Sequence, residues 1–81
     1  MQAQDKDKLR VFLKSCLEEN GNHEPLNDDD SLFMSARLDS LDLTNLVIFL
    51  EQTFGVNFAK VMFEVEMIDS INEIESFLDQ Q

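Results

Sequence analysis

The chain has 81 residues, with 17 acidic and 6 basic side chains, a formal net charge of −11 and a pI of about 4.1. This length leaves room for one core, so we expect a single domain over residues 1–81. Such an acidic chain lacks the cationic footprint that nucleic acids and anionic membranes require, whereas basic patches on other proteins are suitable partners.

The first predicted helix is followed by a long loop. Apolar residues spaced like one face of a helix run from Leu9 to Leu17, and the stripe ends at Glu19, just before the stop signal Asn20-Gly21-Asn22. Residues 20–37 are expected to form a loop that is pinned to the core by Leu26, Leu32 and Phe33. Loops this long are uncommon in small domains and often carry function.

The second predicted helix has clear signals at both ends. Asp39 or Ser40 is expected as its N-cap, and Asp42 supplies the acid that follows three residues after Asp39. Gly55 is suited to the left-handed conformation that ends many helices. The apolar face between these ends consists of Leu43, Leu46, Val47, Leu50 and Phe54.

Two further helices are predicted after Gly55. Ser70 and Glu73 form a capping-box pattern at the start of the last helix. A short helix before it is indicated by Phe58, Val61, Met62 and Val65, and the last helix has an apolar face of Ile71, Ile74, Phe77 and Leu78. The chain is therefore predicted to be all-α, a four-helix bundle of three main helices and one short one.

Residues that could catalyse a reaction or hold a metal are few and scattered. His23 lies in a polar loop without an orienting partner, and Cys16 lies on the apolar stripe of the first helix. The run Asp28–Asp30 lacks the alternating ligands, the central Gly and the late Glu of a calcium loop. We therefore expect no catalytic residue and no metal site.

The N-terminal residues give no targeting signal. Residues 1–10 are polar, unlike a signal peptide, and the longest apolar run, Leu46–Leu50, is too short to cross a bilayer. These features predict a cytoplasmic protein that does not enter a membrane. A monomer is expected.

Leu38-Asp39-Ser40-Leu41-Asp42-Leu43 is the segment with the most chemical interest. Taken alone, Ser40 is most simply a helix cap. A serine at a helix N-terminus is also a good seat for a covalently attached phosphate, because unpaired backbone N–H groups and the helix dipole favour negative charge there. The long loop before it keeps the hydroxyl accessible.

This segment, together with the following residues 44–55, closely resembles the acyl carrier proteins of fatty acid and polyketide synthesis. The first helix, the long loop, Ser31-Leu32-Phe33 and the capped last helix follow the family's order, so the resemblance covers nearly the whole chain. It implies that Ser40 carries 4′-phosphopantetheine, transferred from coenzyme A, and that the arm holds acyl groups as thioesters. It also implies that the protein itself catalyses nothing.

The resemblance further implies which surfaces are used. The partners are a phosphopantetheinyl transferase and acyl-processing enzymes with basic docking patches, and the residues expected to meet them are Asp39, Leu41, Asp42, Ile48 and Glu51. As simpler explanations, Asp42 supports the cap and Glu51 is an ordinary solvated charge. An acyl chain is expected to shelter between the second and third helices against Phe58, Met62 and Phe63.

Several positions depart from the family pattern. Ala36, Arg37 and Leu38 stand where most members have a nearby Gly, and Arg37 puts a cation next to the attachment segment, where it is a candidate to meet the phosphate. Asn45 and Gln52 replace glutamates that are usual in fatty-acid carriers. The unusually apolar third helical segment adds to these signs of a specialised carrier in a dedicated pathway.

Two alternatives stay open from the sequence. One is an aminoacyl or D-alanyl carrier, because the arm holds the cargo and the protein sequence does not specify it. The other is an unmodified interaction module that has the carrier fold and uses its acidic helix only to bind a basic partner.

Overall fold

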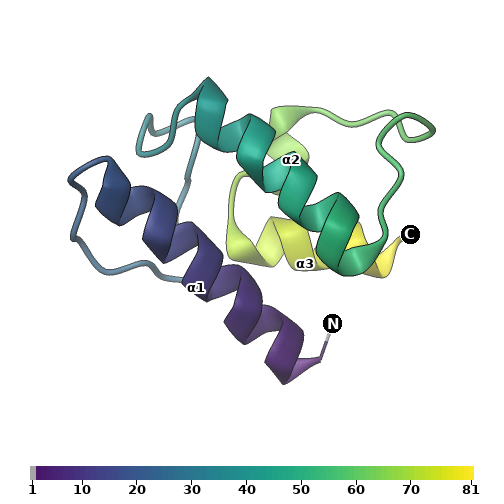
Figure 1. The fold of residues 1–81 in the computed structure, drawn as a ribbon, viewed down its shortest axis with the longest axis horizontal. Coiled ribbons are helices and arrows are strands. Elements are labelled where there is room, and N and C mark those ends of the chain that lie inside the picture. Colours follow the sequence, from purple (N-terminus) through teal and green to yellow (C-terminus); the bar gives the residue numbers. More distant parts are fainter. Residues whose placement is uncertain (1) are drawn as a thin grey trace.

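The structure is a computed structural model that describes residues 2–81. In this part of the chain there are three α-helices, one 3₁₀ turn and no strand, which confirms the predicted all-α fold (Figure 1). The elements are α1 (Ala3–Glu19), α2 (Ser40–Phe54), the 3₁₀ turn η1 (Val65–Ile68) and α3 (Ile71–Asp79).

The helices begin and end where the sequence signals lie. α1 ends at Glu19 before Asn20, and Gly55 follows α2 with a φ of 73°, in the left-handed region that favours glycine. The Ser70 hydroxyl accepts a hydrogen bond from the Glu73 backbone N–H and so caps α3. The buried core is built from the apolar faces of all these elements, with Leu9, Leu13, Leu46, Leu50, Ile68, Ile71 and Ile74 fully enclosed.

α1 and α2 run antiparallel. The Asn20 side chain contacts Asp42 at one end of the pair, and the rings of Phe12 and Phe49 stack with centroids 4.3 Å apart near the middle. The backbone of α3 lies near those of η1 and α1 over more residues than the backbones of α1 and α2 lie near each other. Side chains, not tightly packed backbones, therefore bridge the space between α1 and α2.

The long loop is fixed by Asp69, which follows η1. Its Oδ1 accepts hydrogen bonds from the backbone N–H groups of Leu32, Phe33 and Met34, and its Oδ2 accepts one from the Ser31 hydroxyl at 2.6 Å. Burial alone would raise the pKa of Asp69, but these hydrogen bonds outweigh it and the pKa is lowered. Leu26 and Leu32 are buried and Phe33 is partly buried, as predicted, so the loop has a fixed path to α2.

The prediction of a helix at residues 58–65 is wrong. Residues 58–64 form turns and extended chain, and the only helical turn of the described segment between α2 and α3 is η1 at Val65–Ile68. Asn57 Oδ1 accepts a hydrogen bond from the Ala59 N–H, which favours a turn over a helix. Phe58 and Phe63 both lie against Phe77 of α3, and these ring contacts override the helical spacing.

Candidate functional site at the start of α2

Asp39 is the residue that caps α2. Its Oδ1 accepts a hydrogen bond from the Asp42 backbone N–H at 3.0 Å, and Asp42 Oδ2 accepts one from the Asp39 backbone N–H at 3.2 Å. The two aspartates thus form a reciprocal capping box. The Asp42 N–H lowers the pKa of the Asp39 carboxyl, because a hydrogen bond to the carboxylate favours its charged form. The sequence left open whether Asp39 or Ser40 is the N-cap of α2, and the structure identifies Asp39.

Ser40 is the first residue of α2 and is exposed. Among residues 2–81 its hydroxyl has no hydrogen-bond partner, and only its backbone carbonyl is used, by the Thr44 hydroxyl at 3.1 Å. The hydroxyl therefore lies at the positive end of the helix dipole without a structural task of its own. A phosphate bonded to this oxygen would be favourably placed.

Asp42 lies behind this site and is only 6% exposed. The Asn20 side-chain amide donates to Asp42 Oδ2 at 2.6 Å, in addition to the capping bond from Asp39. The expectation that Asp42 is a docking charge is therefore wrong for this structure, since a buried, hydrogen-bonded carboxylate is not presented to a partner. Its role is to hold the start of α2 against the end of α1.

Arg37 turns away from Ser40 and towards the long loop. Its guanidinium donates to Asn22 Oδ1 and to the backbone carbonyls of Glu24 and Pro25, and it pairs with Asp30. The side chain thereby ties the end of the loop to its beginning. The idea that Arg37 meets a phosphate on Ser40 is not supported by this arrangement.

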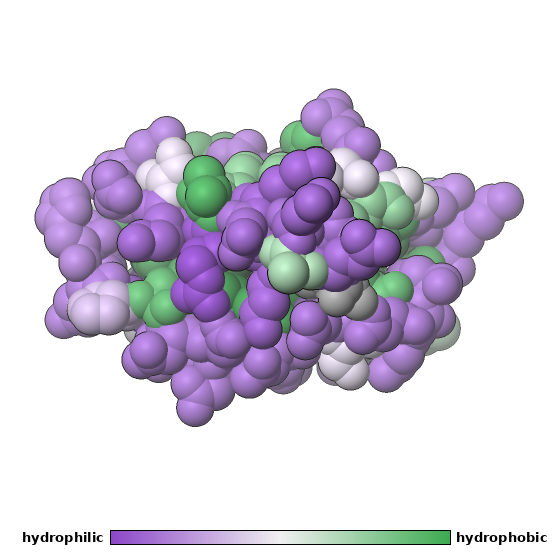
Figure 2. All heavy atoms as spheres, turned by 90° about the horizontal axis from the view of Figure 1, so that it is seen from below, coloured by the Kyte–Doolittle hydropathy of each residue, from purple (hydrophilic) through white to green (hydrophobic). Residues whose placement is uncertain are grey.

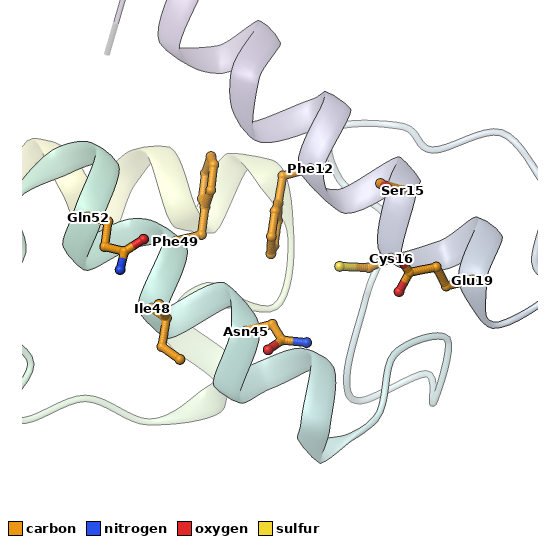
Figure 3. Close-up of a pocket in the computed structure, with 8 residues that line it drawn as sticks. All are labelled: Phe12, Ser15, Cys16, Glu19, Asn45, Ile48, Phe49 and Gln52. Atoms are coloured by element: carbon orange, nitrogen blue, oxygen red, sulfur yellow. The ribbon is translucent and has the colours of Figure 1, made fainter.

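A cavity of about 290 Å³ opens between α1 and α2, next to the site (Figure 3). Its apolar walls are Phe12, Cys16, Ile48 and Phe49, and its polar walls are Ser15, Glu19, Asn45 and Gln52. Burial raises the pKa of the Cys16 thiol to about 11, and the charges of Asp42 and Glu19 add to this effect. The cavity was not predicted from the sequence. The replacement of the usual glutamates by the neutral residues Asn45 and Gln52, which line it, was the one sequence feature that pointed to this surface.

The family model described as "Phosphopantetheine attachment site" matches residues 8–78 of the chain. The chain belongs to this family. The search of the curated proteins found no match, and the search of the solved structures found none either. The matched range includes all of α2, α1 from Lys8 onwards and α3 up to Leu78.

The protein is thus a phosphopantetheine carrier. Carriers of this family bear a covalently attached 4′-phosphopantetheine group, are not enzymes, and interact with phosphopantetheinyl transferases and acyl-processing enzymes. The described residues fit such a group, because an exposed hydroxyl without a partner stands at the N-terminus of a 15-residue helix.

The remaining expected partner residues of the carrier lie on α2. Leu41 is 68% exposed and Ile48 is 43% exposed, seven residues further along the same face. Glu51 is also exposed. With Asp42 buried, Glu51 is the only exposed acid between the first and last residue of α2.

The residues predicted to line an acyl pocket separate into two groups. Phe58 and Phe63 are partly buried, with ring centroids 4.8 Å apart, and both contact Phe77. Met62, by contrast, is 96% exposed, so it is not a wall residue in this structure. The rings of Phe58 and Phe63 thus pack against each other and against α3.

The surface of the carrier is mostly polar on the face seen from below in the orientation of Figure 1. Figure 2 shows that hydrophobic residues on this face form small separate groups within a hydrophilic surface. Within residues 2–81, no group of three or more His, Cys, Asp and Glu side chains is arranged to hold a metal ion. No helix in the described part of the chain has the length and apolar character needed to cross a membrane.

Proposed function

We propose that Ser40 is the attachment point of the 4′-phosphopantetheine arm and that the carrier presents acyl groups to the enzymes of fatty acid, polyketide or related biosynthesis. The observation that carries this proposal is the division of roles at the start of α2. Asp39 caps the helix, so the exposed Ser40 hydroxyl is free of hydrogen bonds within the described chain. The terminal thiol of the arm supplies the chemistry, because it holds acyl groups as thioesters.

Attachment requires one bond exchange at Ser40. The Oγ atom loses its proton to a base of the transferase and bonds to phosphorus, while the diphosphate bond of coenzyme A breaks and adenosine 3′,5′-bisphosphate leaves. The residues around Ser40 assist the transfer by holding the hydroxyl in place. The capping box of Asp39 and Asp42 fixes the backbone on either side of the hydroxyl, and the positive end of the α2 dipole favours the new phosphodiester.

Partner enzymes are expected to meet the exposed face of α2. Leu41 and Ile48 offer apolar contacts on this face, and Glu51 offers the exposed charge. Tethering the cargo next to this face raises its local concentration at each enzyme that binds there. The carrier contributes this delivery and no catalytic group.

Intact mass spectrometry tests the attachment site. The purified protein is incubated with coenzyme A and a phosphopantetheinyl transferase, and it should gain the mass of one phosphopantetheine group. Ser40→Ala should gain none, whereas Ser35→Ala, which removes an exposed hydroxyl from the preceding loop, should be modified normally. Modification of Ser40→Ala, or an unchanged mass of the wild type with several active transferases, would overturn the proposal.

A loading experiment then assigns the cargo. The modified protein is offered to acyl-transferring enzymes and to amino-acid ligases, and acyl loading is expected to dominate. Preferential loading by an amino-acid ligase would identify an aminoacyl or D-alanyl carrier instead.

A further inference from the structure

The cavity between α1 and α2 begins at the Ser40 end of the bundle. The antiparallel register places Asn20 opposite Asp42, next to Ser40, and Phe12 opposite Phe49 further along. Between these two contacts lie the cavity walls contributed by Cys16 of α1 and Asn45 of α2 (Figure 3). The cavity therefore lies between Ser40 and the aromatic pair along the helix axis, beyond the contact of Asn20 with Asp42.

A second hollow continues beyond the aromatic pair. It measures about 540 Å³ and shares Phe12 and Phe49 with the first cavity, and its other walls are Asp7, Lys8, Val11 and Thr53. The two hollows thus lie along one seam between the helices, with the stacked rings between them. We call this seam the α1–α2 groove.

The groove lies within reach of an arm on Ser40. Ile48 is eight residues after Ser40, which places it about 12 Å along the helix axis at a rise of about 1.5 Å per residue. A phosphopantetheine arm contains two amide units and spans on the order of 15–20 Å when extended, comparable to a chain of five residues. The thiol end of the arm therefore reaches the level of Ile48 and Phe49.

The walls match the arm and its cargo in polarity. Asn45 and Gln52 contribute neutral amides, which can hydrogen-bond to the amides of the arm. Phe12, Ile48 and Phe49 contribute the apolar surface next to them. Glu19 lines the cavity and is exposed, and its charge disfavours an anionic cargo.

We propose, on the basis of the function proposed above, that the α1–α2 groove holds an uncharged, apolar acyl cargo, with Asn45 and Gln52 bound to the arm and Phe12, Ile48 and Phe49 in contact with the acyl group. This site replaces the expected pocket at Phe58 and Phe63, whose rings pack against Phe77.

Cys16 is compatible with a thioester in this site. A thiolate, rather than a thiol, attacks thioesters. Because burial raises the pKa of the Cys16 thiol to about 11, the side chain stays protonated near neutral pH and leaves the cargo intact. Cys16 is also the only cysteine of the chain, so it serves as a reporter inside the groove.

The first measurement is the alkylation rate of Cys16. The carrier is loaded with an acetyl or a hexanoyl group on its arm, which blocks the arm thiol, and mass spectrometry verifies the loading. The hexanoyl form should react with N-ethylmaleimide at least about tenfold more slowly than the acetyl form, because each buried methylene favours the occupied groove roughly fourfold and burial of only two of the additional methylenes already exceeds tenfold. Equal rates would contradict the groove as the cargo site.

Two variants separate occupation of the groove from a general stabilisation of the fold. Ser15→Phe places a ring in the groove from an exposed position of α1, and it should abolish the difference between the acetyl and hexanoyl forms. Lys14→Phe places the same ring at the adjacent exposed position, which does not line either hollow, and should retain the difference. Protection that persists in Ser15→Phe would contradict the proposal.

Nuclear Overhauser effects locate the cargo directly. Protons of the hexanoyl group should show cross-peaks to the rings of Phe12 and Phe49. Cross-peaks to Phe58 and Phe63, or none to the protein, would overturn the groove assignment. The earlier mass measurement detects a carrier that gains no arm. That result would contradict the attachment at Ser40 and would not test the groove.

Discussion

The Asn20 side-chain amide donates a hydrogen bond to Asp42 Oδ2 across 2.6 Å, and this contact joins the end of α1 to the first turn of α2. The same carboxylate oxygen accepts the Asp39 backbone N–H. One buried side chain therefore completes the helix cap and sets the spacing of the two helices that border the α1–α2 groove.

Removing the Asp42 carboxylate should destabilise the carrier. Asp42→Ala leaves the Asn20 amide and the Asp39 N–H without an acceptor, so the free energy of unfolding is expected to fall by about 1–3 kcal/mol. Urea unfolding followed by circular dichroism measures the change. Glu51→Ala, which removes an exposed acid from the same helix, should change it by less than about 0.5 kcal/mol. Equal effects of the two substitutions would contradict the structural role of Asp42.

Asp69 should make the stability depend on pH in the acid range. Its folded pKa is lowered, so it contributes stability above the ordinary carboxyl pKa of about 3.9, and this contribution is lost as the pH falls from there through the folded pKa. Asp69→Asn keeps an oxygen acceptor for the three backbone N–H groups but lacks the charge. Wild type should exceed this variant by about 1–3 kcal/mol at pH 7, because hydrogen bonds to charged groups are stronger.

The difference between wild type and Asp69→Asn should shrink in urea unfolding measured at successively lower pH below about 4. Asp29→Asn removes an exposed loop carboxylate and serves as the control, with an expected change below about 0.5 kcal/mol at pH 7. A difference between wild type and Asp69→Asn that is constant from pH 7 to pH 2 would show that the charge of Asp69 is not involved.

Ala36 adopts a left-handed backbone conformation with a φ of 65°. This conformation costs a residue with a Cβ about 1–2 kcal/mol, whereas glycine adopts it freely but loses about 0.4–1 kcal/mol through the greater entropy of the unfolded chain. Ala36→Gly should therefore stabilise the carrier by roughly 0.5–1 kcal/mol in thermal or urea unfolding.

Gly55→Ala is the matched reverse substitution. Gly55 has a φ of 73° and no atom within 4 Å of the added Cβ, so only backbone strain opposes the change. A loss of about 1–2 kcal/mol is expected. Destabilisation by Ala36→Gly would indicate that the backbone at Ala36 is not left-handed in solution.

Alanine substitutions at Ser40 and at Asp39 should have different effects on the free energy of unfolding. Ser40→Ala removes a hydroxyl that has no hydrogen-bond partner in residues 2–81, so the free energy of unfolding should stay within about 0.5 kcal/mol of wild type. Asp39→Ala removes the N-cap and should lower the urea midpoint clearly. A larger loss for Ser40→Ala than for Asp39→Ala would reverse the assignment of the cap.

The helices with strong local signals could be predicted from the sequence. The end of α1 at Glu19, the capped starts of α2 and α3, and Gly55 after α2 all depend on residues within a few positions of the helix end. The family resemblance centred on residues 38–43 and extended over nearly the whole chain, and the match over residues 8–78 confirms it.

Features that depend on distant residues could not be predicted in this way. The segment of Phe58 and Phe63 is not helical because both rings pack against Phe77, which lies in another element. The buried Asp42 is hydrogen-bonded to Asn20, 22 residues away. The hydrogen bond from the Leu32 N–H to Asp69 joins residues that are 37 positions apart. For the left-handed backbone at Ala36, the only indication in the sequence was that most family members have a glycine nearby, a residue that favours this conformation.

The separation of the cap, at Asp39, from the proposed attachment site, at Ser40, has an evolutionary consequence. Because Asp39 stabilises the helix and Ser40 does not, a single substitution at Ser40 yields a protein that folds, keeps the exposed Leu41 and Ile48, and bears no arm. With the attachment point and docking face proposed above, such a protein would bind the same enzymes as the carrier without delivering a cargo to them. Under the proposed function, loss of this one hydroxyl would therefore convert the carrier into a competitor of the intact carrier for its partner enzymes.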